Sequence, residues 1–225
     1  MHLFYQPRLN EGIHSLEGDE IHHVKVLRLS PGDEILVTDG KGRLAEAVVA
    51  KGVDFKVQKT IDTPSPVQIH LFVAPTKNAN RIEWLVEKGT EIGVRSITLT
   101  ECSRNERHRI NHERLSKMAV SAMKQSQQSW LPVINELTSF GDVVKQKFDQ
   151  QFIAYVDHSN PDQLKNIAKA GGSYGLLIGP EGDFTNEEVE AAIANGWRKV
   201  SLGKTRLRTE TAALAGVLTL VQLNT

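Results

Sequence analysis

Cysteine is almost absent from this chain: Cys102 is the only one among 225 residues. A single cysteine cannot close an intramolecular disulfide and cannot supply a cysteine-based zinc site, so neither kind of cross-link stabilises the fold. It is also typical of a protein from a reducing compartment. The first residues lack a basic start followed by an apolar core, so we expect no secretory signal peptide and a cytoplasmic protein.

An excess of charge of one sign is also missing, because 27 Lys and Arg residues balance 27 Asp and Glu residues. The overall charge therefore does not indicate a nucleic-acid partner. The basic residues are nevertheless concentrated between Ser103 and Trp130. This segment contains Arg104, Arg107, Arg109, Arg114, Lys117 and Lys124, opposed only by Glu106 and Glu113. It is either the solvated face of a helix or a stripe that contacts phosphates.

No apolar run is long enough to cross a membrane. The most apolar stretch, Thr211–Leu223, is shorter than the ~20 residues that a transmembrane helix needs. We expect a helix over Thr209–Leu223 that is apolar around nearly its whole circumference. A protein in water buries such a helix on all sides, so it is either central in the fold or covered by a second copy of the chain. This predicts a homodimer and no membrane partner.

The motifs that bind nucleotide phosphates and metals are missing as well. Gly203-Lys204-Thr205 imitates the end of a P-loop, but that motif needs a glycine five positions earlier, where Arg198 stands. The glycines within 171–175 do not have the G-x-G-x-x-G spacing. No zinc signature and no Ser-His-Asp nucleophile elbow occurs. We therefore expect no metal and no cradle for a nucleotide triphosphate.

The first 60 or so residues are rich in β-strand signals. Strands are expected at 34–38, 44–50 and 55–61, with an Asp-Gly turn between the first two and one short helix before them. Thr63-Pro64-Ser65-Pro66 then interrupts the chain, because two prolines so close together cannot continue a helix or a central strand. These features predict a small barrel with one helix, and a domain boundary in this segment.

Strands and helices alternate after this boundary. Strands are expected at 67–74, 96–100, 133–137, 151–156, 174–178 and 199–202, and helices at 78–93, 112–129, 161–170, 186–195 and 209–223. Alternation of this kind indicates a largely parallel sheet with helices on both faces, which is an α/β fold.

Ligands of an open parallel sheet bind beyond the carboxyl ends of its strands, so two loops at such ends are the candidate sites. The first, Ile178–Phe184, has two glycines around a Pro-Glu pair, and Thr185 with Glu188 forms a capping box after it. The second, Leu202–Thr211, opens the apolar final helix. A tight turn and a capped helix explain most of these residues. The paired glycines of the first loop slightly favour backbone that approaches a ligand.

Taken together, GPEGDF at Gly179–Phe184 and LGKTRLRTETA at Leu202–Ala212 resemble the signature of the RsmE family. These enzymes are 16S ribosomal RNA uridine-N3 methyltransferases of the SPOUT superfamily. Further segments resemble family motifs in the same order along the whole chain: His23–Arg28, Trp84–Gly93, Asn105–Arg107 and Ala122–Pro132. Two positions depart from the family pattern: Asp183 stands where glycine is usual, and Gln128 lies where arginine is frequent.

The resemblance implies two domains. Residues 1–67 would be a PUA-like RNA-binding barrel, and residues 68–225 would be a SPOUT-type α/β methyltransferase domain with a trefoil knot, an exception to the rule that chains do not thread through themselves. It also implies S-adenosyl-L-methionine as the methyl donor, held near the interface of a homodimer, and 16S rRNA of the small ribosomal subunit as the partner. The residues implied to bind the donor are Ala154, Ile178, Gly179, Pro180, Glu181, Gly182, Leu202, Gly203, Leu207, Arg208, Thr209 and Thr211.

The implied reaction indicates which side chains are catalytic. Methylation at N3 of uridine requires loss of the imide proton, so a cation near the uracil carbonyls would stabilise the developing negative charge. Arg208 and Arg206 lie beside the implied donor loop and are the candidates for this cation. Glu181 or Glu210 would accept the proton or orient Arg208. The residues expected to bind RNA are Arg28, Arg104, Arg107, Arg114 and Lys124.

Two other functions remain open at this point. A non-enzymatic RNA-binding protein would use the barrel and the basic segment alone, but it would leave the glycines of Gly179–Gly182 unexplained. A related methyltransferase acting on another RNA site is the second alternative, because one fold hosts several chemistries.

Overall fold

The computed structural model describes the chain except for residues 13, 106–109 and 158–161. The chain folds into two compact units. The first comprises residues 1–65 together with 120–131, and the second comprises residues 66–119 together with 132–225. Residues 120–131 therefore belong to the first unit, although they lie far beyond the proline-containing segment in the sequence.

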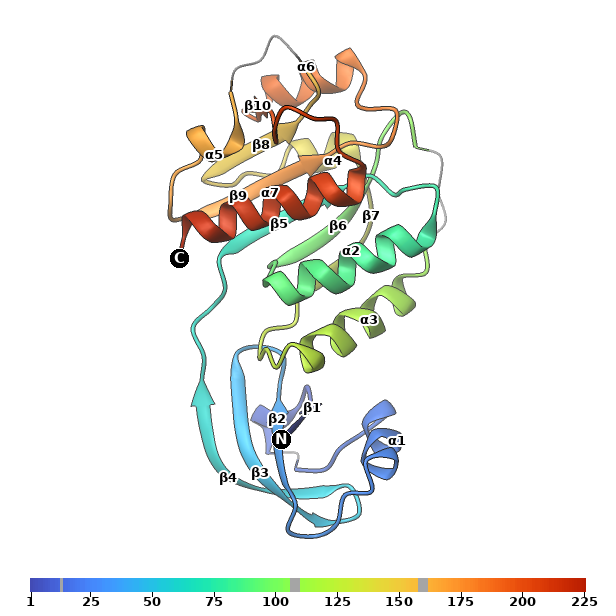
Figure 1. Ribbon diagram of the computed structural model, residues 1–225, viewed down its shortest axis with the longest axis vertical. Helices are drawn as coiled ribbons and strands as arrows, with labels where there is room; N and C mark the ends of the chain where they lie inside the picture. Colours follow the sequence, from blue (N-terminus) through green and yellow to red (C-terminus); the bar gives the residue numbers. More distant parts are fainter. Residues whose placement is uncertain (13, 106–109, 158–161) are drawn as a thin grey trace. The chain divides into compact units, whose positions relative to one another are not determined.

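The first unit contains a four-stranded sheet with the order β1-β2-β3-β4 (Figure 1). Its strands are β1 (His2–Tyr5), β2 (Glu34–Thr38), β3 (Arg43–Lys51) and β4 (Asp54–Asp62), accompanied by α1 (Asp19–Val26) and a 3-10 turn at Leu9–Glu11. β1 is parallel to β2, and the other neighbours are antiparallel. The three predicted strands are present. β1 escapes prediction because four residues are too few for a periodic signal.

Alternation along β3 gives this sheet a buried face. Ala45, Ala47 and Val49 are buried, whereas the residues between them are partly exposed, because successive side chains of a strand point to opposite faces. They join a core that includes Phe4 and Ile35.

The turn between β2 and β3 ties residues 120–131 to this unit. The Gly42 N–H donates to the carbonyl oxygen of Ser129 at 2.9 Å, and the Thr38 hydroxyl donates to the same oxygen at 3.2 Å. Gly42 has a φ of 102°, and a Cβ atom there would lie 2.4 Å from the Trp130 ring. Only glycine fits, so the turn residues that predict a hairpin also hold a distant segment.

The second unit is built on a six-stranded sheet with the order β10-β8-β9-β5-β6-β7. All its strands are parallel: β5 (Gln68–Val73), β6 (Ser96–Glu101), β7 (Val133–Ser139), β8 (Gln150–Ala154), β9 (Ser173–Ile178) and β10 (Arg198–Val200). The central strands are nearly continuous apolar runs, as expected for a sheet that is covered on both faces. The predicted α/β class with a parallel sheet is confirmed.

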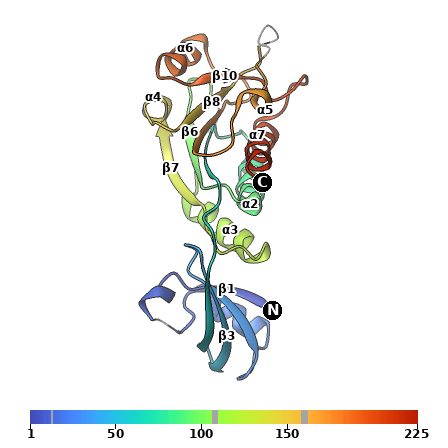
Figure 2. The ribbon, with the colours of Figure 1, turned by 90° about the vertical axis from the view of Figure 1, so that its left-hand side faces the viewer.

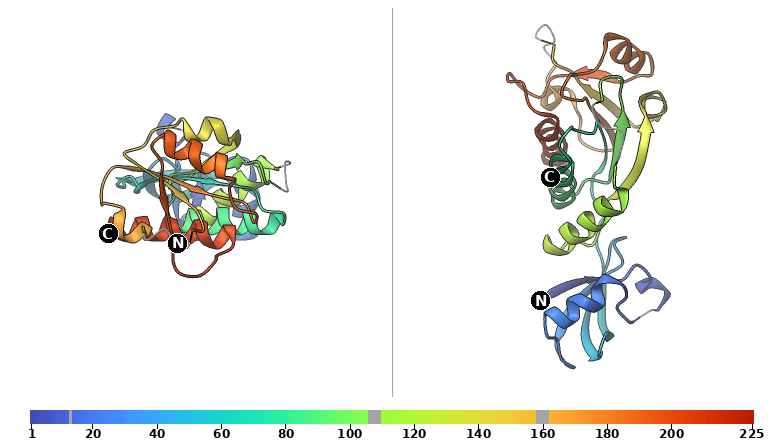
Figure 3. Two further views of the ribbon diagram at one scale, coloured as in Figure 1. Left: turned by 90° about the horizontal axis from the view of Figure 1, so that it is seen from above. Right: turned by 90° about the vertical axis from the view of Figure 1, so that its right-hand side faces the viewer.

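Helices cover both faces of this sheet. The helices after residue 66 are α2 (Ala79–Ile92), α3 (His112–Gln125), α4 (Phe140–Val144), α5 (Leu164–Ile167), α6 (Asn186–Ala194) and α7 (Thr209–Leu223). The last residues of α3 belong to the first unit. Seen from above, α4 and α6 lie on one face, and α2 and α7 lie on the other (Figure 3, left). α2 and α7 pack against each other, as Figures 1 and 2 show.

Some helices differ in length from the prediction. The helix expected at 112–129 ends at Gln125, because Gln127 adopts a positive φ of 54°. The helix expected at 161–170 is reduced to Leu164–Ile167, and its predicted first residue lies outside the described part of the chain. α4 has only five residues, too few for a recognisable period of 3.6.

α7 has the predicted bounds, but it is not buried on all sides within one chain. Ala213, Val217 and Leu220 are buried against the sheet, and a Cβ atom at Gly216 would lie 2.6 Å from Leu176 Cδ2. Leu218, on the same helix, is 43% exposed. Of the two expected arrangements, a helix wholly enclosed within one chain is therefore not found, and coverage by a second copy stays a prediction. Within the described residues, no helix combines the length and apolar character needed to cross a membrane.

Candidate active site

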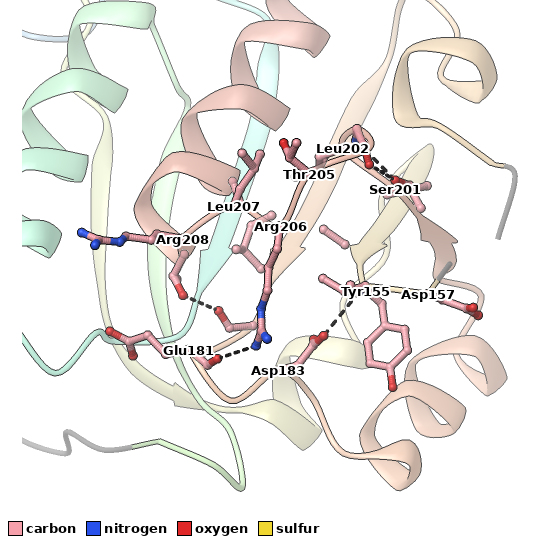
Figure 4. A pocket seen from close by; sticks show the side chains of 18 of the residues that line it. Tyr155, Asp157, Glu181, Asp183, Ser201, Leu202, Thr205, Arg206, Leu207 and Arg208 are labelled. Atoms are coloured by element: carbon pink, nitrogen blue, oxygen red, sulfur yellow. Dashed lines mark hydrogen bonds between the residues drawn. The ribbon is translucent and has the colours of Figure 1, made fainter. Parts of the chain in front are cut away.

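A cavity of about 600 Å³ lies at the carboxyl ends of three neighbouring strands, β10, β8 and β9. Its walls come from the segment after β8, the loop between β9 and α6, and the loop between β10 and α7 (Figure 4). Parallel strands end at the same edge of a sheet, which is why segments distant in sequence meet here. The sequence places its two candidate loops at this edge, and the cavity unites them.

The β9–α6 loop is anchored by its buried Phe184. A Cβ atom on Gly179 would lie 3.0 Å from the Phe184 ring, so this glycine permits the close packing of ring and backbone. The predicted capping box is present: the Glu188 N–H donates to the Thr185 hydroxyl, and the Thr185 N–H donates to the Glu188 carboxylate. These contacts fix the loop in one conformation.

Arg104 also holds this loop. Its Nη1 donates to the carbonyl oxygen of Gly182 at 2.7 Å and to that of Phe184 at 3.4 Å. An arginine that we expected to grip RNA therefore satisfies backbone carbonyls at the cavity wall.

Two contacts join the β10–α7 loop to the β9–α6 loop. The buried Thr209 hydroxyl donates to the carbonyl oxygen of Gly179 at 3.0 Å. Arg206 Nη2 donates to the carbonyl oxygen of Glu181 at 3.1 Å. Arg206, a catalytic candidate, is thus engaged in holding two walls of the cavity together.

Arg81, from the first turn of α2, lies between the two candidate carboxylates. Its Nη1 donates to Glu181 Oε1 at 3.3 Å, and its Nε lies 3.7 Å from Glu210 Oε1. The Glu210 side chain is only 9% exposed, and its Oε2 has no hydrogen-bond partner among the described residues. We expected Glu181 or Glu210 to accept the proton or to orient Arg208; in the structure both carboxylates face Arg81. Nothing in the sequence indicates Arg81, because it lies 100 positions before Glu181.

Arg208 differs from Arg206 in having no side-chain partner among the described residues. It lines the cavity and is exposed. In the described part of the chain, its guanidinium takes part in no hydrogen bond or ion pair. Figure 4 shows the Arg208 and Arg206 side chains pointing in different directions. Of the two candidate catalytic arginines, Arg206 uses one donor on a backbone carbonyl, whereas Arg208 uses none among the described residues.

Comparison with known proteins decides the family. Residues 63–222 match the family model described as an RNA methyltransferase domain, and residues 16–57 match that of an RNA methyltransferase PUA domain. The chain belongs to the RNA methyltransferase family. All residues that line the cavity fall within residues 63–222, the part of the chain that matches the RNA methyltransferase domain.

Members of this RNA methyltransferase family resemble the chain along its length. Ribosomal RNA small subunit methyltransferase E of Bacillus subtilis is 27% identical over 221 residues, which cover 89% of this chain and 86% of that protein. A solved structure of a probable rRNA-methyltransferase from Porphyromonas gingivalis is 37% identical with a TM-score of 0.92, covering 100% of this chain and 98% of that one. The ribosomal RNA small subunit methyltransferase E of Neisseria gonorrhoeae, solved bound to S-adenosyl methionine, is 26% identical with a TM-score of 0.87, again covering 100% and 98%. The resemblance to RsmE is confirmed.

Most of the residues expected to bind the methyl donor line the cavity. They are Ala154, Ile178, Gly179, Pro180, Glu181, Leu202, Gly203, Leu207, Arg208 and Thr209. Gly182, Thr211 and the catalytic candidate Glu210 are not among the lining residues. Asp183, Lys204 and Thr205 line the cavity as members of the predicted loops, although they were not singled out as donor-binding residues. Gln163, Ser201 and Ala212 line it from outside those loops. Thr211 is exposed and does not line the cavity, whereas the next residue, Ala212, does. Successive side chains of a helix point in different directions, so only some residues of the first turn of α7 face the cavity.

The residues expected to bind RNA differ in whether their charges are already paired. Arg114 forms a two-pronged ion pair with Glu83, with Nε 2.6 Å from Oε1, and Lys124 pairs with the buried Glu20. Arg28 is exposed, with a φ of 53°. Arg107 lies outside the described residues, as do Glu106 and Arg109. The basic segment is therefore not a uniform stripe of free cations.

Two side chains near the site have altered acidity. Burial raises the pKa of the Asp183 carboxyl, while hydrogen bonds from backbone N–H groups and the charges of Arg206 and Arg104 act in the opposite direction. Burial also raises the pKa of the Cys102 thiol, so it is an inert core residue. Among the described residues, no group of three His, Cys, Asp or Glu side chains is placed to hold a metal ion.

Proposed function

We propose that the protein is an S-adenosylmethionine-dependent methyltransferase that acts on N3 of a uridine in 16S rRNA of the small ribosomal subunit. The observation that carries this proposal is the cavity of about 600 Å³ formed by three strand-end loops in a chain of the RNA methyltransferase family. Its volume falls within the range of roughly 300–1,000 Å³ that is typical of small-molecule sites.

The residues of the cavity fit the methyl donor. Its lining combines apolar groups such as Ile178, Leu202 and Leu207 with loop backbone and charged side chains at the edge, as expected for a ligand with apolar and polar parts. Apart from the two adjoining residues, no protein atom lies within 4 Å of the place where a Gly203 side chain would begin, so the backbone there is open to a ligand. When bound, S-adenosylmethionine supplies a methyl group that its sulfonium makes electrophilic.

The roles of the chain's own side chains follow from their contacts. Arg208, an arginine at the cavity without a partner among the described residues, stabilises the negative charge on the uracil carbonyls. Glu181 lines the cavity and Glu210 does not, which favours Glu181 as the acceptor of the imide proton. Arg81 and Arg206 hold Glu181, one through its carboxylate and the other through its backbone carbonyl. They are positioning residues.

RNA binding is assigned to the first unit. We infer that residues 1–67 form the PUA-like RNA-binding barrel, supported by the PUA family match at residues 16–57. Residues 68–225 would form the SPOUT domain with its trefoil knot. The exposed Arg28 is the favoured phosphate contact, because it has no ion-pair partner among the described residues, unlike Arg114 and Lys124.

We further propose that the protein is a cytoplasmic homodimer. Trp84 on α2 is 44% exposed and Leu218 on α7 is 43% exposed, and these two helices pack side by side. Large apolar side chains exposed on adjacent helices are typical of a surface that a partner covers. A second copy over α7 would complete the burial that its apolar sequence requires.

Two measurements test the proposed function. Calorimetry with S-adenosylmethionine alone should detect binding without added metal or nucleotide triphosphate. Mapping of modified nucleosides in ribosomal RNA from a strain lacking the protein should reveal one missing N3-methyluridine. Absence of donor binding would favour the non-enzymatic RNA-binding alternative, and loss of a different modification would favour another RNA site.

A further inference from the structure

Asp183 has an uncommon backbone conformation at the end of the turn that its N–H closes on the carbonyl oxygen of Pro180. Its φ is 64°, in the left-handed region that side chains other than glycine rarely adopt. The other described non-glycine residues with positive φ, Arg28 and Gln127, each follow the end of a helix. A left-handed residue is ordinary at that place. Asp183 instead lies in the middle of the β9–α6 loop, at the wall of the cavity.

The side chain of Asp183 connects two walls of the cavity. Its Oδ2 accepts a hydrogen bond from the Val156 N–H at 3.4 Å, and its Oδ1 accepts one from the Phe184 N–H at 2.9 Å. Val156 lies two residues beyond the end of β8, whereas Phe184 belongs to the β9–α6 loop. Figure 4 shows the Asp183 carboxylate directed toward the segment after β8. The carboxylate therefore spans the gap between two loops that both line the cavity.

Two arginines bind backbone carbonyl oxygens of the β9–α6 loop around Asp183. Arg104 binds the carbonyl oxygens on both sides of Asp183, those of Gly182 and Phe184. Arg206 binds the carbonyl oxygen of Glu181. Both arginines also act on the Asp183 carboxyl through their charge, and together they oppose the effect of burial, which raises its pKa. A strained residue persists only where its surroundings over-determine it, and such residues cluster at functional sites.

We propose that Asp183 is a positioning residue of the methyl-donor site, whose carboxylate clasps the segment after β8 to the β9–α6 loop and so preforms the cavity. In this backbone conformation the Asp183 carboxylate accepts the hydrogen bond from the Val156 N–H. Preformed walls favour ligand binding, since less loop ordering remains to be done when the ligand arrives. This inference rests on the proposed function for the identity of the ligand.

Two variants separate the carboxylate from the strain. Asp183→Gly and Asp183→Ala both remove the clasp, but only alanine keeps a side chain at positive φ. We expect both variants to bind S-adenosylmethionine about three- to tenfold more weakly than the wild type by calorimetry, as the loss of one or two hydrogen bonds implies. The glycine variant should melt at a higher temperature than the alanine variant, because it relieves the strain. Donor affinity would then depend on the presence of the Asp183 carboxylate, and melting temperature would depend on the strain of the backbone at residue 183.

Hydrogen exchange supplies a readout that does not depend on any ligand. The Val156 amide should exchange about tenfold faster in both variants, because its acceptor is gone. Gln127→Gly is the matched control: it relieves a positive φ of 54° in the first unit and should leave both donor affinity and Val156 exchange unchanged.

The outcomes are distinguishable. Wild-type donor affinity in Asp183→Gly, or unchanged exchange at Val156, would overturn the clasp. If donor affinity rises and falls with melting temperature across the wild type and both variants, Asp183 has only a structural role. That result would also overturn the clasp. If the wild type binds no S-adenosylmethionine, the proposed function is refuted. If Val156 nevertheless exchanges faster in the variants, the clasp remains as a link between two loops of another site.

Discussion

At the scale of single residues, Arg206 and Arg208 lie two positions apart and differ in what they can do. Arg206 donates a hydrogen bond to the backbone carbonyl oxygen of Glu181, whereas Arg208 has no partner among the described residues. A group that stabilises charge in a transition state must have its donors free in advance. The geometry therefore separates one catalytic candidate from one positioning residue.

Arg208→Ala should lower the rate of methyl transfer far more than it weakens ligand binding. Removing a donor that stabilises developing negative charge typically costs on the order of a hundredfold in rate. Arg208→Lys should recover little, because an ammonium cannot reproduce the planar fork of a guanidinium. The measurement is single-turnover transfer with donor and RNA saturating.

Lys204→Ala provides the matched control for Arg208, since Lys204 is another exposed cation of the same cavity. It should retain most of the activity. A near-normal rate in Arg208→Ala would move the catalytic role to Arg206 or Glu181.

Thr209→Val should destabilise the second unit by about 1–2 kcal/mol. The Thr209 hydroxyl is buried and donates to the carbonyl oxygen of Gly179, which would lose this partner while remaining buried. Thr209→Ser should keep the bond and most of the stability. Thr219→Val on the same helix is the control, because the Thr219 hydroxyl only donates to the Ala215 carbonyl within the helix. Urea unfolding measures all three, and equal losses for Thr209→Val and Thr219→Val would contradict the link.

At the scale of elements, the glycines of the two cavity loops are not equivalent. Gly203 has a φ of 148° and no atom within 4 Å of a would-be Cβ, whereas a side chain on Gly179 would strike the Phe184 ring at 3.0 Å. A larger residue at Gly179 disturbs the core. A larger residue at Gly203 enters the cavity.

Gly203→Val should weaken binding of S-adenosylmethionine by at least about tenfold, because the branched side chain occupies ligand space. Gly52→Val is the matched control: Gly52 also has a positive φ, of 63°, and open space around it, but it lies in the β3–β4 turn of the first unit. Calorimetry should show a loss of affinity only for Gly203→Val, and comparable affinities in the two variants would place the donor elsewhere.

His70 on β5 makes the stability of the second unit depend on pH. Its pKa is lowered from the ordinary value of 6.5, first by burial and then by the charge of Arg95. The unfolded chain therefore binds a proton more readily, and stability is lost as pH falls from 6.5 toward the lowered pKa. Above that window the contribution is complete.

His70→Gln should remove this part of the pH dependence. The free energy of unfolding, measured in urea between about pH 7 and pH 5, should fall less steeply in the variant than in the wild type. Parallel curves would show that His70 does not contribute to the slope.

At the scale of the whole molecule, the main expectation is a homodimer formed over α2 and α7. Sedimentation at micromolar concentration should give the mass of two chains. Leu218→Arg should shift the population to monomers, because it places a charge on an apolar surface that becomes buried. Ile193→Arg is the control: Ile193 is 50% exposed on α6, a helix of the opposite sheet face (Figure 3). A monomeric wild type would refute the dimer.

The pattern of the sequence was enough to predict most of the second unit. The strands from β5 to β10 and the bounds of α7 follow from apolar runs and from turn residues, which are local properties. The two candidate loops follow from the rule that ligands bind at the carboxyl ends of parallel strands. β1 and α4 are too short to carry such a pattern, and the membership of residues 120–131 in the first unit depends on contacts with the Gly42 turn.

The sequence by itself determined the α/β class, the parallel sheet, the loops that line the cavity and the RNA methyltransferase family, because periodicity and motif order are written in neighbouring residues. Only the tertiary structure decided which charged groups are free to act. Arg104 meets the carbonyl of Gly182, and Arg81 meets Glu181, across many intervening residues. Such pairs form when the sheet brings distant loops to one edge, so neighbouring residues in the sequence could not reveal that Arg206 holds a cavity wall while Arg208 has no partner among the described residues.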